Sequence, residues 1–441
     1  MPAKDHRTPA AASPGPSITA GKNLEPTAGA ARSTAGMPLW KLALLLAGPG
    51  LVVMLADTDA GSVITAAQSG AQFGYSLLIF QLILIPILFI AQELTVRLGL
   101  VTQKGHGELI SEHFGKPWAW LSVGTLMVSC IGALLTEFAG IEGVGQLFGV
   151  PPWISVSMTV VFMVIVVATG SYRQVEIVAI LIGLFELAFV AVAAVSHPSP
   201  AAMATAITRQ PFGNPSYLFL IAGNVGAVIM PWMIFYQQSA VVDKGLNISH
   251  LKAERWDTGI GAVVTQIIMG AVLIVTASTI GLKNPNTPLD TVQQIASALT
   301  PILGSWWGRA VFSLGMLGAA LVATIVVSLT AAWGLGEVTG YKRSLANHPF
   351  EAPWFYAVYL ICLLIGAGVV LSGVNLVKLT VGVEVMNALL LPIVLGFLFM
   401  LAVRALPEPW RLKGRYAWLV GCIITITAVV GVYAGIVGVL N

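Results

Sequence analysis

The sequence has few charged residues and few cysteines. Charged residues make up 9% of its 441 residues, whereas an ordinary soluble domain has about 25%. The net charge of +3 is small and scattered, which argues against a nucleic-acid partner. The three cysteines, Cys130, Cys362 and Cys422, lie far apart within apolar blocks. They therefore indicate neither a disulfide framework nor a thiolate metal site.

Apolar residues are abundant instead. They make up 57% of the chain, and the mean hydropathy is +0.87. Because a bilayer core of about 30 Å needs about 20 apolar residues per helix, the apolar blocks predict an all-α polytopic membrane protein. We place eleven transmembrane helices near residues 38–72, 75–98, 118–147, 152–169, 174–195, 217–242, 256–281, 309–339, 352–372, 376–402 and 415–440.

The loops predict the orientation of the chain. With the N-terminus inside, thirteen lysines and arginines fall in short inner loops, and three fall in outer loops. Because positive residues collect on the cytoplasmic side, we expect a cytoplasmic N-terminus and an outside C-terminus in the inner (plasma) membrane of a bacterium. Residues 1–36, rich in Ala, Pro, Gly, Ser and Thr, predict a disordered cytoplasmic tail rather than a signal peptide. The outer loop at 282–308 predicts a short surface helix.

Two predicted spans contain residues that interrupt a helix. The first breaks at "DAGS", residues 59–62, and the sixth breaks around "GAVIMPWM", where Pro231 cannot donate to the helix. The breaks lie five spans apart, a pattern typical of inverted-repeat transporters with a substrate site near the midplane. We therefore expect a LeuT-type 5+5 arrangement, with a first repeat at 37–200, a second at 201–405 and an eleventh helix within 406–441.

The first break carries charge at a depth where charge is unfavourable. A carboxylate at the middle of a membrane helix costs about 2.5 to 3.5 kcal/mol, so Asp57 and Asp59 need a compensating partner. Carbonyls freed at the breaks, notably those of Ala56 and Ala227, must face protein or a polar cavity, and with a carboxylate they form a cation site. Met230 adds a soft thioether, which favours Mn, Fe, Co or Cd over Mg or Ca. In the simpler alternative, Asp59 only caps the second half-helix and Met230 only fills space.

These motifs resemble those of the Nramp family of divalent metal transporters. The likeness extends from about residue 38 to 440 and includes "TEFAGIEGV" and "SYRQVE". The family's DPGN motif corresponds to DAGS from Asp59, its QAG to Gln68, Ser69 and Gly70, and its MPH to Met230, Pro231 and Trp232. The resemblance implies metal ligands at Asp59, Met230 and the carbonyls of Ala56 and Ala227.

The chain also departs from the family pattern. Ser62 stands in place of the asparagine and is a shorter neutral oxygen donor, Trp232 replaces one histidine, and Gln237 replaces another. Glu137 matches the family's proton-route carboxylate, but Leu134 replaces an aspartate. Because titratable groups are lost, proton coupling stays open. A divalent cation entering down an inside-negative potential gains about 4.6 kcal/mol per 100 mV, so coupling is not energetically required.

Other acids in the predicted spans have two interpretations each. Asp57 is either a further metal ligand, which would make the site harder and favour Mg or Ca, or a water-facing charge. Glu137 either relays protons or is a buried neutral carboxyl. Glu384 is expected to line the pathway, as are Trp232 and Gln237, or else to form a structural hydrogen bond. Glu186 has no partner nearby in the sequence.

We therefore weigh three functional hypotheses. The first is a monomeric secondary transporter that imports Mn²⁺ or Fe²⁺ by alternating access, with or without a coupled proton. The second is an uncoupled Mg²⁺ transporter of an Nramp-related type. The third is an amino-acid or organic-cation symporter of the same fold, with Asp59 binding an ammonium group or sodium. The chain lacks the motifs of an enzyme, and we expect no cofactor and no nucleic-acid partner.

Overall fold

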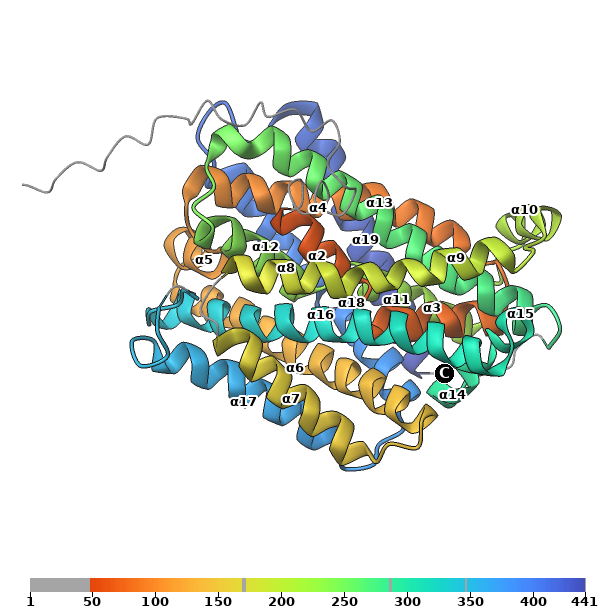
Figure 1. The fold of residues 1–441 in the computed structure, drawn as a ribbon. Coiled ribbons are helices and arrows are strands. Elements are labelled where there is room, and N and C mark those ends of the chain that lie inside the picture. Colours follow the sequence, from red (N-terminus) through yellow and green to blue (C-terminus); the bar gives the residue numbers. More distant parts are fainter. Residues whose placement is uncertain (1–47, 169–171, 285–287, 346, 441) are drawn as a thin grey trace, which may run out of the picture. The chain divides into compact units, whose positions relative to one another are not determined.

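The structure, a computed structural model, describes residues 48–440 except 169–171, 285–287 and 346. Within these residues every regular element is a helix, as Figure 1 shows. This confirms the predicted all-α class. The predicted tail at 1–36 lies outside the described residues, and so does the beginning of the first predicted span.

The helices of the described chain run in the following order. The first half contains α2 (Pro49–Asp57), α3 (Ala60–Phe73), α4 (Leu78–Thr102), α5 (His106–Phe114), α6 (Lys116–Leu147), α7 (Pro152–Ala168), α8 (Tyr172–Gly183), the 3₁₀ turn η1 (Leu184–Glu186), α9 (Leu187–Val195) and α10 (Pro200–Thr208). The second half contains α11 (Pro215–Val228), α12 (Pro231–Asp243), η2 (Ile248–His250), α13 (Leu251–Thr276), the π-helical turn η3 (Ala277–Gly281), α14 (Val292–Ser297), α15 (Thr300–Leu303), α16 (Ser305–Thr339), α17 (Pro353–Val370), α18 (Leu376–Arg404) and α19 (Gly414–Leu440).

The apolar helices match the predicted spans in position. In the described residues, nine helical segments are long and apolar enough to cross a membrane, counting α8 to α9 and α11 to α12 as one segment each. The helices α2 and α3 form a further candidate span that is bent by 47°, and α7 is a shorter apolar helix of 17 residues. The number of eleven spans stays a prediction, because α7, with 17 residues, lies at the lower end of the length that a spanning helix needs.

The first span breaks earlier than the sequence predicts. Helix α2 ends at Asp57 and α3 begins at Ala60, so only Thr58 and Asp59 are non-helical. The sequence predicts the break at residues 59–62, but residues 60–62 are already helical, so that part of the prediction is wrong. Asp59 has an extended backbone and its side chain accepts the N–H of Ser62, as an N-cap does. The helix can therefore start at once, and Gly61 is its second residue rather than its breaker.

The sixth span breaks where the sequence predicts. Helix α11 ends at Val228 and α12 begins at Pro231; between them Ile229 is non-helical and Met230 is extended. Proline suits the first position of a helix, because its missing N–H would have no partner there and its φ is already helical. Pro231 thus ends one half-helix and starts the next.

Three connecting segments also contain helices. The predicted surface helix of the outer loop is present as two short helices, α14 and α15. The segment "HGELISEHF", predicted as an inner loop, is the helix α5 with Glu108 in its first turn. Helix α10 lies between the fifth and sixth spans and was not predicted. Its nine residues are rich in Ala, which favours helix.

The two broken spans lie together inside the bundle (Figure 1). Helix α3 packs against α11 of the sixth span and against α6, α13 and α18. Helix α2 packs against α12, α13 and α16. The half-helices are therefore enclosed by other helices, and their breaks can face protein rather than lipid, as the freed backbone groups require.

Candidate metal site

Asp59 both caps a helix and keeps a free carboxylate oxygen. Its Oδ1 accepts the N–H of Ser62 at 2.7 Å, which satisfies the capping alternative. Its Oδ2 is buried and has no hydrogen-bond partner, and the residue as a whole is fully buried. An unpaired buried carboxylate oxygen is strongly disfavoured unless a cation or proton joins it. Asp59 therefore has one oxygen for the fold and one for a ligand.

The break frees the carbonyl of Ala56. In a continuous helix the N–H of Ala60 would donate to that carbonyl. Here the Ala60 N–H donates instead to Oε2 of Glu137 on α6, at 3.1 Å, and Glu137 Oε1 accepts the hydroxyl of Thr136 at 3.1 Å. Glu137 thus stabilises the positive N-terminal end of α3, next to Asp59, and leaves the Ala56 carbonyl available at the break.

The second break frees the carbonyl of Ala227 in a different way. In a continuous helix its partner would be the N–H of residue 231, but Pro231 has none. The Ser62 hydroxyl donates to the Ala227 carbonyl at 3.0 Å instead. This bond joins the two breaks directly and places two of the predicted neutral oxygen donors side by side.

Met230 lies at the second break with its sulfur already in contact with a donor. The residue is fully buried, and the indole N–H of Trp232 donates to its Sδ at 3.0 Å. A thioether sulfur is a weak acceptor, so this bond fixes the side chain while leaving sulfur electron density for a metal. Trp232, which stands where the family's MPH motif has histidine, therefore holds the Met230 side chain in place.

Glu384 of α18 comes close to Asp59. A Cβ atom at Gly61 would collide with Glu384 Oε1 and would lie 3.2 Å from Asp59 Oδ1, so both carboxylates border the space that a side chain at Gly61 would fill. Glu384 Oε2 accepts the side-chain amide of Asn387 at 3.1 Å, whereas Oε1 is buried without a partner. Asn387 in turn accepts the hydroxyl of Ser129 on α6 at 2.8 Å. Gly61 therefore allows the approach of a second carboxylate.

Two more buried acids lie on the other side of the first break. Both carboxylate oxygens of Asp57 are buried without partners, and Asp57 experiences the charges of Asp59, Glu384 and Glu186. Glu186 accepts a hydrogen bond from the hydroxyl of Thr58 in the break. It is the last residue of η1, where the fifth span tightens from α-helix to 3₁₀ helix. The sequence indicated no partner for Glu186, because Thr58 lies far away along the chain.

Five fully buried acids thus surround the first break without a basic partner. Among the described residues, none of the ion pairs includes any of them. Nor do three His, Cys, Asp or Glu side chains come together there as a ready metal cluster, within the described ranges. A cation at this position must therefore use carbonyl, hydroxyl or thioether ligands besides carboxylates. The five acids are Asp57, Asp59, Glu137, Glu186 and Glu384.

Gln237 is not at the breaks. It lies seven residues beyond Met230 on α12, which is about 10 Å along a helix axis. Its side-chain amide donates to the hydroxyl of Thr258 on α13 at 3.0 Å, and its oxygen is buried without a partner. It can line a route from the breaks toward the inner side but does not touch the metal site.

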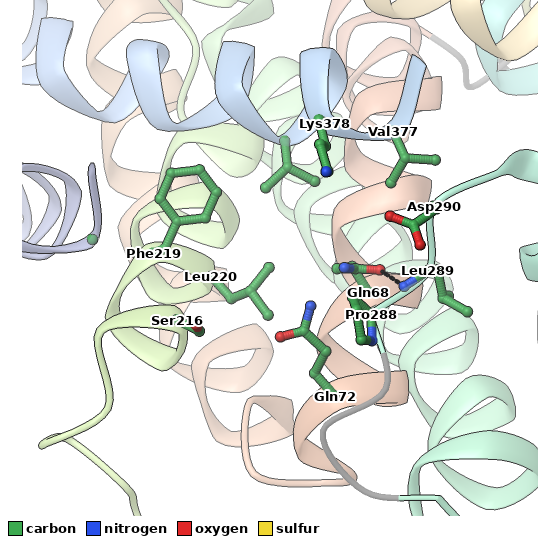
Figure 2. Close-up of a pocket in the computed structure, with 12 residues that line it drawn as sticks. Gln68, Gln72, Ser216, Phe219, Leu220, Pro288, Leu289, Asp290, Val377 and Lys378 are labelled. Atoms are coloured by element: carbon green, nitrogen blue, oxygen red, sulfur yellow. Dashed lines mark hydrogen bonds between the residues drawn. The ribbon is translucent and has the colours of Figure 1, made fainter. Parts of the chain in front are cut away.

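A cavity of about 370 Å³ opens beyond the breaks on the predicted outer side. Figure 2 shows Gln68 and Gln72 of α3 facing Lys378 of α18 and Asp290 of the outer loop. Gln68 accepts the N–H of Leu289 at 2.8 Å, which ties the loop to α3. Gln68 is nine residues beyond Asp59, or about 14 Å along the helix, so the cavity lies above the buried site.

Comparisons with known proteins show the family to which the chain belongs. A family model described as natural resistance-associated macrophage protein-like, or Nramp, matches residues 50–436. The chain belongs to the Nramp-like family. A protein named divalent metal cation transporter MntH, from Yersinia pestis (strain Pestoides F), is 31% identical over 315 residues, covering 68% of this chain and 75% of that protein. The MntH of Granulibacter bethesdensis is 28% identical over 332 residues, covering 71% and 72%.

Solved structures show that the Nramp-like chain shares its fold with known transporters. The manganese transporter of Eremococcus coleocola, in complex with an aromatic bis-isothiourea substituted compound, has a TM-score of 0.68 and 20% identity, covering 92% of this chain and 90% of that one. MhsT in complex with L-phenylalanine has a TM-score of 0.58 and 15% identity, covering 89% and 97%. The LeuT-type fold expected from the two breaks is confirmed.

In this Nramp-like chain the structure brings most of the predicted site residues together. Asp59, Ser62 and Ala227 are linked by hydrogen bonds at the breaks, with Glu137 bound to the same end of α3. Glu384 was predicted only to line the pathway, but it borders the site itself. The position of Gly61, the third residue of the DAGS motif, could not reveal this contact, because Glu384 lies on another span.

Proposed function

We propose that this protein transports a divalent metal cation across the membrane, in the inward direction, with the metal held at the two breaks. The observation that carries the proposal is the fully buried Asp59 carboxylate, which has one free oxygen and no basic partner. The relatives named as divalent metal cation transporters support it, since two of them match about 70% of the chain. A transporter rather than an enzyme fits all of these relatives.

The proposed ligands come from both broken spans. Asp59 supplies charge, Met230 supplies the thioether, and the carbonyls of Ala56 and Ala227 supply neutral oxygens, with the Ser62 hydroxyl beside Ala227. Glu384 supplies a second carboxylate, and two carboxylates balance the charge of a divalent ion. A thioether in the set favours softer ions such as Mn²⁺, Fe²⁺ or Cd²⁺. We therefore propose Mn²⁺ or Fe²⁺ as the substrate.

Alternating access would expose this site to each side in turn. Asp59 and Met230 are fully buried, and cavities lie on both sides of them. The outer one has about 370 Å³, and an inner one of about 270 Å³ is lined by Ser239 and Glu337. Broken helices in inverted repeats provide the hinges for such a movement. The repeat boundaries at 37–200 and 201–405 and the monomeric state belong to this proposal.

Glu137 is the proposed proton acceptor if transport is coupled. It binds the N-terminal end of α3 through the Ala60 N–H, and it lies close enough to Asp59 to interact with its charge. A metal arriving at Asp59 would therefore change the electrostatic field at Glu137. Metal entry accompanied by acidification, and loss of the acidification in Glu137→Gln, would support this role.

An uncoupled Mg²⁺ transporter is the second candidate. Two observations favour it. The Trp232 N–H occupies part of the Met230 sulfur, which weakens the soft ligand, and Asp57 has two free buried oxygens next to the break. Oxygen-rich, anionic surroundings suit Mg²⁺. The symporter alternative gains nothing from the likeness to MhsT, which at 15% identity shows the fold alone.

Uptake into proteoliposomes tests the function. The purified chain is reconstituted and offered Mn²⁺, Fe²⁺, Cd²⁺, Mg²⁺ and Ca²⁺, with a pH dye and a metal dye inside. Asp59→Asn keeps an oxygen that accepts the Ser62 N–H but removes the charge. We expect it to lower uptake by about a hundredfold or more, since even residues that only support metal ligands change affinity by about 10- to 100-fold. Full uptake by Asp59→Asn would refute the site, and no uptake of any divalent ion by the parent would refute the function.

The identity of the metal is tested at Met230. Met230→Ala should lower the ratio of Mn²⁺ to Mg²⁺ uptake by about tenfold, because only the softer ion gains from the thioether. Glu112→Gln removes an exposed acid outside the spans and should leave both rates unchanged. An unchanged ratio in Met230→Ala would favour the Mg²⁺ candidate.

A further inference from the structure

An apolar groove between α4 and α13 ends in positive charge. It has a volume of about 630 Å³ and is lined on the α4 side by Ile85, Pro86 and Phe89. On the α13 side it is lined by Lys252, Arg255, Trp256, Gly259, Ile260, Val263 and Val264. The groove is distinct from the metal site, because none of these residues lies at either break.

The α13 side of the groove follows one face of that helix. Residues 252, 255, 256, 259, 260 and 263 are spaced three and four apart, so they form one stripe. Trp256, Ile260 and Val263 are 67%, 55% and 41% exposed. The stripe therefore faces away from the bundle, toward the lipid, along much of a spanning helix.

Two residues leave the groove open: a proline on α4 and a glycine on α13. Pro86 lies inside α4 and lacks the N–H that would continue its helix. Gly259 lies opposite, where an added Cβ would already be 3.4 Å from the ring of Phe89. A larger residue at Gly259 would fill the groove.

The positive end lies where the predicted orientation places the inner membrane surface. Lys252 and Arg255 stand near the start of α13, and Arg255 contacts Glu93 at 2.7 Å. Glu93 also pairs with Arg97 at 2.5 Å, so one acid is shared by two arginines. With Lys252, these four groups carry a net charge of +2. None of the ion pairs of the described residues includes Lys252.

The dimensions fit one leaflet of a bilayer. From Lys252 to Val263 the stripe is about 17 Å long at 1.5 Å per residue, and half of a bilayer core is about 15 Å. Trp256 lies one turn beyond Lys252, the position of aromatic residues at a membrane interface. Basic pockets between helices on the cytoplasmic side are typical binding sites for anionic headgroups.

We propose that this groove binds an anionic phospholipid of the inner leaflet. Its phosphate lies against Lys252 and the free N–H groups of Arg255, and one acyl chain lies along Phe89, Gly259 and Ile260. The opposite face of α13 holds the half-helix α2, since Asp257 accepts the N–H groups of Gly48 and Leu51 at 3.1 and 3.0 Å. A lipid bound on one face therefore braces the helix that anchors α2 on the other.

A second groove provides an internal comparison. It lies between α18 and α19, has about 690 Å³, and is lined by residues such as Phe399, Trp418 and Gly421, with no basic residue among them. The same lipid chains can enter both grooves, but only the α4–α13 groove can select a headgroup by charge. The two grooves should therefore differ in lipid preference.

Native mass spectrometry of the full chain tests the proposal. The protein in detergent is titrated with phosphatidylglycerol or phosphatidylcholine of the same acyl chains, and retained lipid is counted. The parent should retain phosphatidylglycerol about fivefold better, and Lys252→Gln should remove that preference, as expected for one positive charge at an anionic surface. Lys342→Gln, which removes an exposed inner charge outside the groove, should keep it. Equal retention of both lipids by the parent, or equal effects of the two lysine variants, would overturn the proposal.

Groove-filling variants supply a second measurement that does not depend on charge. Gly259→Leu should lower retention of phosphatidylglycerol, whereas Gly421→Leu in the uncharged groove should keep the preference for it. Millimolar inorganic phosphate should not displace the lipid, and displacement would show a free-phosphate site instead. A chain dimer that Gly259→Leu abolishes would show that a second copy occupies the groove. Both of these outcomes contradict the proposal, and neither bears on metal transport.

Discussion

The two broken spans reach a similar shape by different chemistry. The first break is made by a side chain, because Asp59 caps α3 and accepts the Ser62 N–H. The second is made by the backbone, because Pro231 has no N–H to offer to Ala227. Four further acids lie close to Asp59 at the first break, one on the same span and three on other spans. At the second break, neither α11 nor α12 has an acid near Met230. The proposed charged ligand and the proposed soft ligand therefore come from separate spans.

This division matters for transport. A site built on one span would move as a unit with it, but the proposed charged and soft ligands belong to two different spans, which the proposed alternating access would move apart. The Ser62 to Ala227 hydrogen bond joins them in the buried arrangement. Opening on either side would pull apart ligands of different kinds, so affinity would fall as the site opens, which a transporter needs for release.

After the loss of Asp59 itself, the largest effect on uptake should come from Gly61→Ala at the first break. The new methyl group would collide with Glu384 Oε1 and press on Asp59, so one carboxylate must leave the site. We expect uptake in proteoliposomes to fall by at least about tenfold, which corresponds to about 1.4 kcal/mol. Gly382→Ala on α18, where an added Cβ meets nothing within 4 Å, is the control. Normal uptake by Gly61→Ala would show that Glu384 need not stand beside Asp59.

Next in size is the removal of the second carboxylate itself. Glu384→Gln keeps the shape and an oxygen for Asn387 but loses the charge, so apparent metal affinity should fall by about tenfold. Apparent KM of uptake measures this. Glu142→Gln neutralises another buried acid of α6, which pairs with Gln146 at 2.8 Å, and should change KM by less than about twofold. Equal effects of both variants would make Glu384 a structural residue.

A smaller effect is expected at the second break. Trp232→Phe removes the N–H that donates to the Met230 sulfur, which should free the thioether for a soft ion. We expect the uptake ratio of Cd²⁺ to Mg²⁺ to rise by about two- to fivefold, as for the loss of one weak hydrogen bond. Trp333→Phe, a buried tryptophan elsewhere on α16, should leave the ratio unchanged. A fall in the ratio would mean that Trp232 positions Met230 rather than competing with the metal.

The last prediction leaves uptake unchanged near neutral pH and concerns only how stably the inner half-helices are held in acid. Asp257 anchors α2, whereas His106 anchors α12 through Gln238 at 3.0 Å. Burial of His106 lowers its pKa to about 4, below the ordinary value of about 6.5, so the folded chain holds the ring neutral. Below pH 6.5 the unfolded chain binds a proton at this ring that the folded chain does not. The free energy of unfolding is therefore highest above pH 6.5 and falls by up to about 3 kcal/mol as the pH drops toward 4. Thermal unfolding in detergent between pH 7.5 and 4.5 measures this loss.

The variant His106→Gln should make that decline shallower. His250→Gln, at an exposed histidine next to α13, should decline as the parent does. If His106→Gln and the parent lose stability with the same pH slope, His106 is not the group that responds.

Much of the site could be predicted from the sequence because its signals are local. A pair of acids in an apolar block and a proline five spans later mark the two breaks, and the residues beside them offer carbonyls and a thioether. The position of the second break is confirmed. The first predicted break begins one residue late and ends three residues late, because glycine was taken as the breaker when the aspartate cap already determines where α3 begins.

Other features depend on contacts between distant segments. Glu384 lies beside Asp59 only because Gly61 leaves room for it, and Glu186 meets Thr58 only because the fifth span packs on the first. No periodicity connects such residues, since they are separated by more than a hundred positions in the chain. The hydrogen bond of Trp232 to Met230 is local, but it depends on a backbone turn at the break that residue identities do not specify.

By itself, the sequence determined the class of this protein, the positions of its apolar helices and the second break, and it supplied the proposed ligands at the two breaks. Hydrophobic length and helix-breaking residues act locally, so they can be recognised without the fold. Only the tertiary structure decided which carboxylates share the site, which oxygens stay free, and where a charged groove faces the lipid. These depend on how neighbouring helices pack, because a buried charge is defined by what surrounds it in space.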